Sequence, residues 1–442
     1  MKYGLRKFFT FLVMTQALYA GLVVDITKGT ISEIPIALTE LFVENKSFIG
    51  RSPEEEIARN IEEVVHKDLT ESGLFRAIDP HAFIQTDFSD GVRFSDWRVI
   101  NAQVLVTGDV KLVDSENFVI TFNVYDIFSQ ERLTHTHFNA KTSDWRRVAH
   151  KVADVIYERV TGEKGYFDTR IVYVSQGQSR NGKRHTRLAI MDQDGANHQY
   201  LSSADQLLLT PRFSPTLHHI IYLDFGEDWK TPRVYIMDTF TGKKKRLGEF
   251  KGMTFAPRFA PDGETVVMSY SREGISCLYS MNIQSGESNQ LTYGTSIDVS
   301  GCYSPKGDEI VFNSDRSGSQ QLYVMSATGH NLRRISFGEG QYASPVWSPR
   351  GDLIAFNKFH NGKFYIGVMR PDGSAERLIT SGYLVEEPSW APNGRVLLYS
   401  KKTSESDPSK IYRIDLTGYN DRQIVTPGPE EAISAAWSPL LP

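Results

Sequence analysis

The spacing of apolar and polar positions changes near residue 165. Before that point, apolar residues recur at helical spacing over residues 53–72 and again over 143–161. Ser52 stands where the first of these helices needs an N-cap, Pro53 takes the first helical position, and Gly73 follows the last turn. The pattern therefore predicts two long helices with defined ends.

Alternating apolar and polar residues between the two helices predict strands over residues 102–112, 118–128 and 132–140. Helices and strands in this proportion form a small α+β unit. We predict an N-terminal domain over residues 21–165, whose last four residues, Gly-Glu-Lys-Gly, serve as the linker to the rest of the chain.

After residue 165 a short motif recurs, in which an aromatic residue precedes Ser-Pro or Ala-Pro and, in most copies, a polar residue and Gly. The aromatic positions are 43 to 47 residues apart. Self-similarity at this period indicates a repeat architecture. The six aromatic residues are Phe213, Phe259, Tyr303, Trp347, Trp390 and Trp437.

Each period predicts the same set of four strands. In the third copy, the aromatic segment is followed by an apolar strand at 310–312, a Tyr-x-Met strand at 322–325 and a polar strand at 331–335. Pro and Gly in the motif suit the corners of the turn that joins the first two strands. Four strands per 40–45 residues is typical of a propeller blade.

The two ends of this repeat region complement each other. Residues 171–174 and 188–191 resemble the second and third strands of a blade that lacks a first strand, whereas the aromatic segment at 435–440 has nothing after it. We therefore predict that residues 168–442 form an all-β six-bladed propeller with four-stranded blades, closed by the C-terminal strand.

Composition favours an exported protein that does not bind nucleic acid. The chain has 442 residues, with 40% apolar and 23% charged, and a formal charge of −4, so it lacks the basic excess expected for nucleic-acid binding. Residues 1–20 combine a basic start, an apolar run over 8–18 and Ala20 before Gly21, which predicts a cleaved signal peptide. The alternative is an uncleaved anchor. No other segment is apolar enough to insert into a membrane.

Cys277 and Cys302 are the only cysteines. The propeller prediction places them on strands at different distances from the axis in neighbouring blades. A disulfide needs Cα atoms within about 7 Å. We therefore expect two buried free thiols.

Motifs of common enzyme classes are absent from the sequence, which has no Gly-x-Ser-x-Gly, His-Glu-x-x-His or phosphate loop. His135 and His137 lie on one face of a predicted strand and form a possible metal pair, but a solvated strand explains them better. Asp90-Gly91 and the loop at 314–318 are accounted for as turns. No catalytic residue, metal ligand or cofactor is predicted.

The loops that lead into the innermost strands converge on one mouth of the central channel. Several of their residues are acidic and one is aromatic, which suits a rim for docking a protein, although exposed loops also carry such residues for solubility. The candidate rim residues are Met253, Thr254, Asp298, Ser300, Tyr342, Ser344, Glu386, Glu387, Glu430 and Glu431.

A signal peptide, a small α+β domain and a six-bladed propeller with Trp-Ser-Pro-x-Gly-like repeats together resemble the TolB family of the periplasmic Tol–Pal system. The segment Val23-Val24-Asp25-Ile26, followed by Gly29 and by Pro-Ile-Ala-Leu at 35–38, is similar to the start of the mature family sequence. The family continues toward Pro-Phe, whereas this chain has Thr-Glu-Leu-Phe at 39–42. The resemblance covers essentially the whole mature chain.

The resemblance implies a non-enzymatic adaptor, expected to act as a monomer. Its propeller mouth would bind the outer-membrane lipoprotein Pal, and a segment of roughly residues 21–32 would engage the inner-membrane-anchored TolA. It also implies that Pal binding changes the order of this segment, and a role in outer-membrane integrity and constriction at cell division. The segment begins with Gly21, Leu22, Val23, Val24, Asp25 and Ile26.

Two other readings of an exported propeller remain. A hydrolase or lactonase would need Asp, Glu or His on several first strands, which instead carry Phe, Tyr and Trp. A glycan-binding propeller would need one repeated pocket per blade, but the loops between blades are not repeated well enough.

Overall fold

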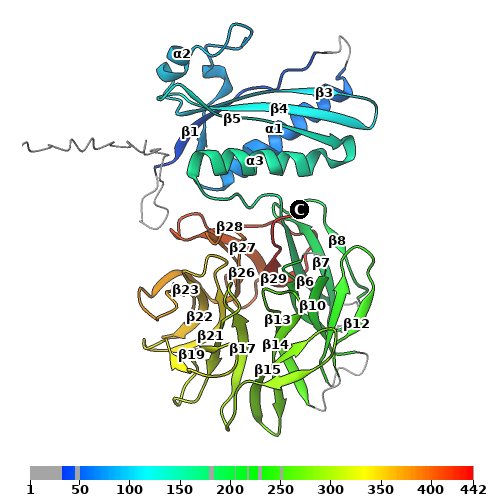
Figure 1. The fold of residues 1–442 in the computed structure, drawn as a ribbon, viewed down its shortest axis with the longest axis vertical. Coiled ribbons are helices and arrows are strands. Elements are labelled where there is room, and N and C mark those ends of the chain that lie inside the picture. The colour runs from blue at the N-terminus through cyan, green and yellow to red at the C-terminus, as the bar shows by residue number, and fades with distance from the viewer. Residues whose placement is uncertain are drawn as a thin grey trace, which may run out of the picture.

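A computed structural model of the chain describes residues 32–44, 50–178, 184–204, 206–216, 219–226, 231–248 and 252–441. An N-terminal domain sits on one end of a β-propeller (Figure 1). The expected signal peptide and the residues Gly21 to Ile26 lie outside the described residues.

The N-terminal domain is built on a five-stranded mixed sheet in the order β2-β1-β3-β4-β5. The strands β3, β4 and β5 match the three predicted from alternation. The sequence analysis did not predict β1 and β2, which are short and pair in parallel through partners distant in sequence. The strands are β1 (Ile34–Leu38), β2 (Phe75–Ala77), β3 (Val104–Leu112), β4 (Asn117–Asp126) and β5 (Glu131–Lys141).

The two predicted helices are α1 (Pro53–Glu71) and α3 (Trp145–Thr161), and they lie on the side of the sheet that faces the propeller (Figure 1). Ser52 caps α1 as predicted: its hydroxyl accepts a hydrogen bond from Glu55 N–H, and the Glu55 carboxylate accepts one from Ser52 N–H. Short helical pieces complete the domain: η1 (Pro80–Ala82), α2 (Phe94–Val99) and η2 (Thr142–Asp144).

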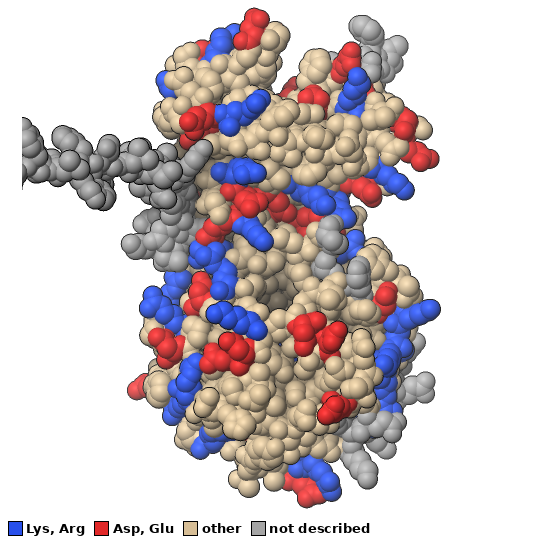
Figure 2. Space-filling view, in the orientation of Figure 1, with Lys and Arg blue, Asp and Glu red and all other residues tan. Residues whose placement is uncertain are grey.

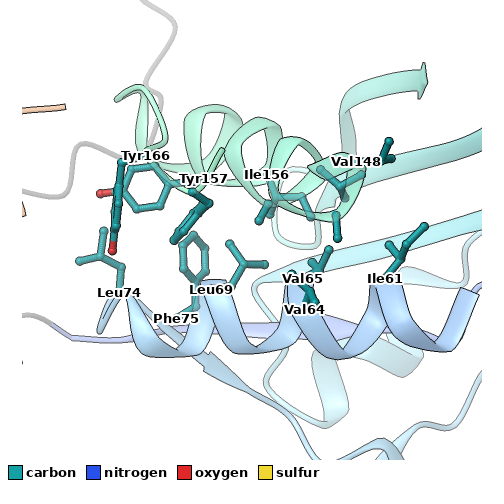
Figure 3. Packing of buried hydrophobic residues seen from close by; sticks show 14 of the residues in the cluster. Ile61, Val64, Val65, Leu69, Leu74, Phe75, Val148, Ile156, Tyr157 and Tyr166 are labelled. Carbon is teal, nitrogen blue, oxygen red and sulfur yellow. The ribbon is translucent and has the colours of Figure 1, made fainter. Parts of the chain in front are cut away.

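The apolar faces of α1 and α3 pack against each other and form a core that continues into the propeller. Figure 3 shows Ile61 and Val65 of α1 facing Val148 and Ile156 of α3. At the propeller end of this cluster, the ring of Tyr166 lies 5.6 Å from that of Trp437. The two domains therefore share one buried apolar cluster.

Six four-stranded antiparallel sheets form the propeller, as predicted. The innermost strands are β9 (Leu208–Phe213), β13 (Met253–Phe259), β17 (Asp298–Tyr303), β21 (Gln341–Trp347), β25 (Leu384–Trp390) and β29 (Glu431–Trp437). The second strands are β10 (His219–Asp224), β14 (Thr265–Arg272), β18 (Glu309–Ser314), β22 (Ile354–His360), β26 (Val396–Lys402) and β6 (Arg170–Gln178).

The third strands carry the Tyr-x-Met pattern or variants of it, and the fourth strands are short and mostly exposed. The third strands are β11 (Arg233–Asp238), β15 (Ile275–Asn282), β19 (Gln321–Ser326), β23 (Lys363–Met369), β27 (Lys410–Asp415) and β7 (Arg184–Asp192). The outer strands are β12 (Lys244–Arg246), β16 (Ser288–Gln290), β20 (Arg333–Arg334), β24 (Arg377–Gly382), β28 (Arg422–Gln423) and β8 (Gln199–Tyr200).

The C-terminal strand closes the ring, which confirms the predicted closure. One sheet has the order β29-β6-β7-β8, so the last strand of the chain is the innermost strand of the blade that begins the propeller. Trp437 pairs with Ile171 in this sheet, and its indole N–H donates to the hydroxyl of Thr169 at 2.7 Å.

The linker fixes which end of the propeller faces the N-terminal domain. Helix α3 ends at Gly162, which has a φ of 74°. The next residue, Glu163, forms ion pairs with Arg350 and Arg395, which lie in the turns after two innermost strands. These turns therefore face the N-terminal domain, and the innermost strands begin at the opposite end of the propeller.

The cysteine prediction is wrong in one respect. Both thiols are free, and Cys277 on β15 is buried, but Cys302 on β17 is only half-buried. Cys302 occupies the position on its innermost strand that Arg212 and Arg258 occupy on theirs, and all three side chains are partly exposed.

One glycine per blade packs against the preceding blade in four of the blades. A Cβ added to Gly373, whose φ is 87°, would lie 2.1 Å from the carbonyl oxygen of Ile335. Equivalent contacts with a backbone carbonyl oxygen of the preceding blade would form at Gly195, Gly329 and Gly418. The turn between the third and fourth strands of a blade therefore also contacts the preceding blade.

We predict that Gly373→Ala lowers the free energy of unfolding by about 2–4 kcal/mol, because it adds a steric clash to an unfavourable φ. The matched control is Gly362→Ala in the same blade. Gly362 also has a positive φ of 72° but nothing lies within 4 Å of an added Cβ, so we expect a loss of about 1 kcal/mol. Urea denaturation of both variants measures the difference, and equal losses would contradict the proposed contact between blades.

Candidate functional site

Every innermost strand has a bulge near its middle. At each bulge one non-glycine residue adopts a left-handed conformation, with φ between 46° and 59°, and the pairing with the second strand shifts in register. Bulges re-aim side chains and are frequent near functional sites. The six residues are Thr210, Ala256, Ser300, Ser344, Glu387 and Ser434.

The sequence analysis placed Ser300, Ser344 and Glu387 at the mouth but missed Thr210, Ala256 and Ser434. A signal for them was available. A proline in a strand pattern marks a bulge or an edge, and Pro directly follows the left-handed residue in four of the six strands. The repeated Pro two residues before the aromatic therefore indicates the ring of bulges.

Three candidate rim residues are buried, so their side chains present little surface to a partner. Thr254 and Asp298 are each 1% exposed and Tyr342 is fully buried. Both carboxylate oxygens of Asp298 accept from Arg316 Nη2 at 2.8 Å. Arg316 lies in the loop that follows β18. The residue types at the mouth do not predict this ion pair.

Tyr342 belongs to a similar internal network. Its hydroxyl accepts from Lys358 Nζ at 2.7 Å and donates to the Glu376 carboxylate at 2.8 Å. Burial raises the pKa of the Tyr342 hydroxyl. The Tyr342 side chain therefore lies inside the protein, bound to Lys358 and Glu376, and is not accessible to a partner.

Glu430 and Glu431 are half-buried, and both are paired within the chain. Glu430 accepts hydrogen bonds from the Ser175 hydroxyl and, at 2.6 Å, from Arg187 Nη2. Burial alone would raise the pKa of Glu430, but these two partners hold it below its usual value. Glu431 accepts from Gln176 and lies 3.3 Å from Lys402 Nζ.

Among the candidate rim residues, Met253 and Glu386 are the two whose side chains are exposed. Met253 is 46% exposed at the start of β13. Glu386 is exposed on β25, yet enough protein surrounds its carboxyl that burial, together with neighbouring Glu387, raises its pKa. A partner can therefore contact these two side chains without breaking the internal pairs that the other acids of the rim form.

The Arg212 side chain connects β9 to two other innermost strands, a feature that the sequence analysis did not use. Arg212 Nη2 lies 3.7 Å from the Glu387 carboxylate, and Arg212 Nη1 lies 3.4 Å from the Ser434 carbonyl oxygen. Burial, followed by the charge of Arg258, lowers the pKa of Arg212 to about 10. Because β9 and β25 belong to the blades on either side of the β29 blade, the Arg212–Glu387 pair joins two innermost strands that are not neighbours in the ring.

The N-terminal domain has a separate groove of about 1100 Å³ between α1 and the sheet. Its apolar lining includes Leu41, Ile61, Val106 and Phe122, and Glu62 lies within it. Burial raises the pKa of Glu62 to about 7, although a hydrogen bond from Leu41 N–H opposes the shift. The groove therefore favours the protonated form of a carboxyl group near neutral pH.

This shift predicts a dependence of stability on pH. A raised folded-state pKa means that the contribution of Glu62 is complete below its ordinary pKa of 4.5 and is lost as pH rises through about 7. At pH 8 Glu62→Gln should therefore be more stable than the unaltered chain by about 2 kcal/mol, allowing for partial exposure. At pH 4 the two should match. Urea titrations at both pH values provide the measurement, and an equal gain at both would contradict the assignment.

Comparison with known proteins identifies the fold and both domains. The family model described as the TolB beta propeller domain matches residues 157–441, and the model of the TolB amino-terminal domain matches residues 22–133. The chain belongs to the TolB family. The crystal structure of TolB from Acinetobacter baumannii superposes with a TM-score of 0.82 at 26% identity, covering 93% of this chain and 98% of that one.

Relatives of similar length align with nearly the whole chain. A Pelagibacter ubique protein is 47% identical and a Rickettsia prowazekii protein 43%, each aligned over 98% of this chain and 98% and 99% of their own length. A Paramagnetospirillum magneticum protein is 48% identical over 95% of this chain and 93% of its own. All three are named Tol-Pal system protein TolB. In the described part of the chain, no helix is long and apolar enough to span a membrane.

Proposed function

We propose that this chain is a non-enzymatic periplasmic adaptor of the Tol–Pal system. Its membership of the TolB family and the names of relatives 43–48% identical over nearly the whole chain support this. On this proposal the first twenty residues direct export, and the mature protein works as a monomer without a cofactor, without inserting into a membrane and without binding nucleic acid.

The propeller mouth is the proposed site for a Pal-like outer-membrane lipoprotein. The observation that carries this proposal is that Met253 and Glu386 are exposed, whereas Asp298, Glu430 and Glu431 are already paired within the chain. Internal ion pairs already hold the surrounding loops in place, so binding would cost little conformational entropy. The Glu386 carboxylate offers a partner for a basic group and Met253 an apolar contact.

The second proposed site is the N-terminal segment of residues 21–32, which would engage a TolA-like inner-membrane-anchored protein. The segment is short and β-prone and directly precedes β1, so it could add to a sheet edge of a partner. An adaptor with these two sites would connect the outer and inner membranes and support envelope integrity and constriction at division.

Glu386→Lys should weaken binding of the purified periplasmic domain of Pal about tenfold. The substitution replaces the carboxylate that would meet a basic group of the partner with a positive charge. The control is Glu264→Lys, which reverses an exposed acid in the turn at the opposite end of β13. Isothermal titration calorimetry would measure both affinities. Equal affinity for Glu386→Lys and the unaltered chain would remove Glu386 from the site.

Deleting residues 21–32 should abolish binding to the TolA-like partner and leave the melting temperature nearly unchanged, since the deletion ends before the first strand of the sheet. Binding of this truncated protein to the partner at full affinity would contradict the second site. Its binding to Pal serves as a control for the integrity of the propeller.

A further inference from the structure

A cluster of metal-binding residue types lies where the two domains meet. It combines His150 of α3 with Asp192 at the end of β7 and Asp194 in the turn that follows. One ligand atom from each residue lies within 4.8 Å of the others. In Figure 2, acidic and basic side chains both gather along this boundary, close to a hollow in the propeller surface.

His150 presents a ring nitrogen that the described residues leave without a hydrogen-bond partner. The side chain is only 3% exposed. Its Nδ1 lies 2.6 Å from the Asp68 carboxylate on α1, whereas its Nε2 is buried and unpaired within the described part of the chain. Histidines that bind a metal typically donate their second ring N–H to a carboxylate in this way, which fixes the tautomer and frees the other nitrogen.

The two aspartates are held in place by further contacts. Asp192 accepts from Asn197 Nδ2 at 2.6 Å and lies 3.5 Å from Arg146 Nε. Asp194 accepts from Ala196 N–H at 3.1 Å, and it also forms an ion pair with Arg146 Nη2. Arg146 binds both carboxylates, yet each aspartate retains lone pairs on its oxygens for a further ligand.

Carboxylates outnumber the guanidinium groups around this cluster. Asp192 and Asp194 are paired with Arg146, and Arg170 Nε lies 3.9 Å from Asp192, whereas Asp68 contacts no cationic side chain other than His150 directly. Arg413 reaches Asp68 only through Gln193 and is already paired with Glu71. Lys67 is half-exposed and 4.0 Å from Asp194. A bound cation would add positive charge where the carboxylates are in excess.

We propose that His150 Nε2 and the carboxylates of Asp192 and Asp194 form a divalent transition-metal site suited to Zn²⁺. One imidazole, two carboxylates and a water complete the four-coordinate arrangement that Zn²⁺ prefers. Asp68 positions the imidazole from the second ring nitrogen. Because one ligand comes from α3 and two from the first blade, the ion ties the N-terminal domain to the propeller. This site is independent of the proposed mouth and of its partner.

Zinc titration of the untagged full-length chain, stripped with a chelator, tests the proposal by calorimetry. We expect one equivalent of Zn²⁺ to bind, and His150→Asn to weaken binding on the order of 100-fold. Asparagine retains a donor where Nδ1 stands and lacks Nε2. The matched control is His135→Asn, which removes an exposed histidine of β5 and should leave zinc affinity unchanged. The proposal is overturned if the unaltered chain binds no zinc, or binds it with the affinity of His150→Asn.

X-ray absorption of the zinc-loaded unaltered chain provides a second readout that does not depend on the folding of a variant. We expect one imidazole and oxygen ligands around the zinc. Sulfur ligation would point to the free cysteines, and two imidazoles would point to another site such as His135 and His137. Either result would overturn the assignment.

Discussion

Deleting residues 435–442 is expected to prevent the propeller from closing, so that most of the chain no longer folds stably at 37 °C. The deletion removes the second half of β29 and with it the pairing of Ala436 and Trp437 with β6. Trp437 is 5% exposed, meets the ring of Tyr166 edge to face and belongs to the apolar cluster shared by both domains. Loss of a buried Trp alone costs about 3–5 kcal/mol, and the unpaired strand adds to that.

Circular dichroism and thermal melting of the truncated protein measure this effect. A milder truncation that removes only residues 441–442 leaves β29 intact and should lower stability by less than about 1 kcal/mol. If the protein that ends at residue 434 melts at the temperature of the full-length chain, the closure by β29 does not stabilise the propeller and this account of the ring is wrong.

Asp68→Ala is expected to have the second largest effect, a loss of about 3–5 kcal/mol of unfolding free energy, since it breaks a buried charged network. Asp68 is 2% exposed and accepts from His150 Nδ1 and from Gln193 Nε2 at 2.8 Å. Its removal would leave two buried polar groups without partners at the domain boundary. Urea denaturation in the presence of a chelator gives the free energy without a contribution from metal ions.

Asp79→Ala is the matched control for this change. Asp79 also pairs with a histidine, His81, at 2.9 Å, but both side chains are largely exposed. Exposed pairs contribute little to stability, so this variant should unfold like the unaltered chain. If Asp68→Ala is as well tolerated as Asp79→Ala, the buried network does not hold the domains together.

Local sequence signals were sufficient for most of the fold. The recurring aromatic-Ser-Pro motif predicted the six blades because turn chemistry and strand alternation repeat within each period. The incomplete blades at the two ends predicted the closure. The N-cap at Ser52 was predictable because it depends on a contact with Glu55, only three residues away. Strands β1 and β2 were missed because parallel pairing depends on residues far apart in sequence.

The candidate site was less predictable because it depends on which charges find partners. Residue type and loop position placed Asp298 and Tyr342 at the mouth. In the structure Asp298 pairs with Arg316, and the Tyr342 hydroxyl forms hydrogen bonds with Lys358 and Glu376. No local pattern reveals such pairs. The prolines after the left-handed residues were a usable signal, and they indicate the bulges in four of the six strands.

The central proposal is that the mouth of the propeller, at the end away from the N-terminal domain, docks a Pal-like lipoprotein. Hydrogen exchange of this chain with and without the purified periplasmic domain of Pal tests it most directly. We predict that protection appears in the segments around Met253 and Glu386, where β13 and β25 begin, and that the turns near Arg350 and Arg395 exchange as in the free protein. Protection confined to those turns or to the N-terminal domain would contradict the proposal.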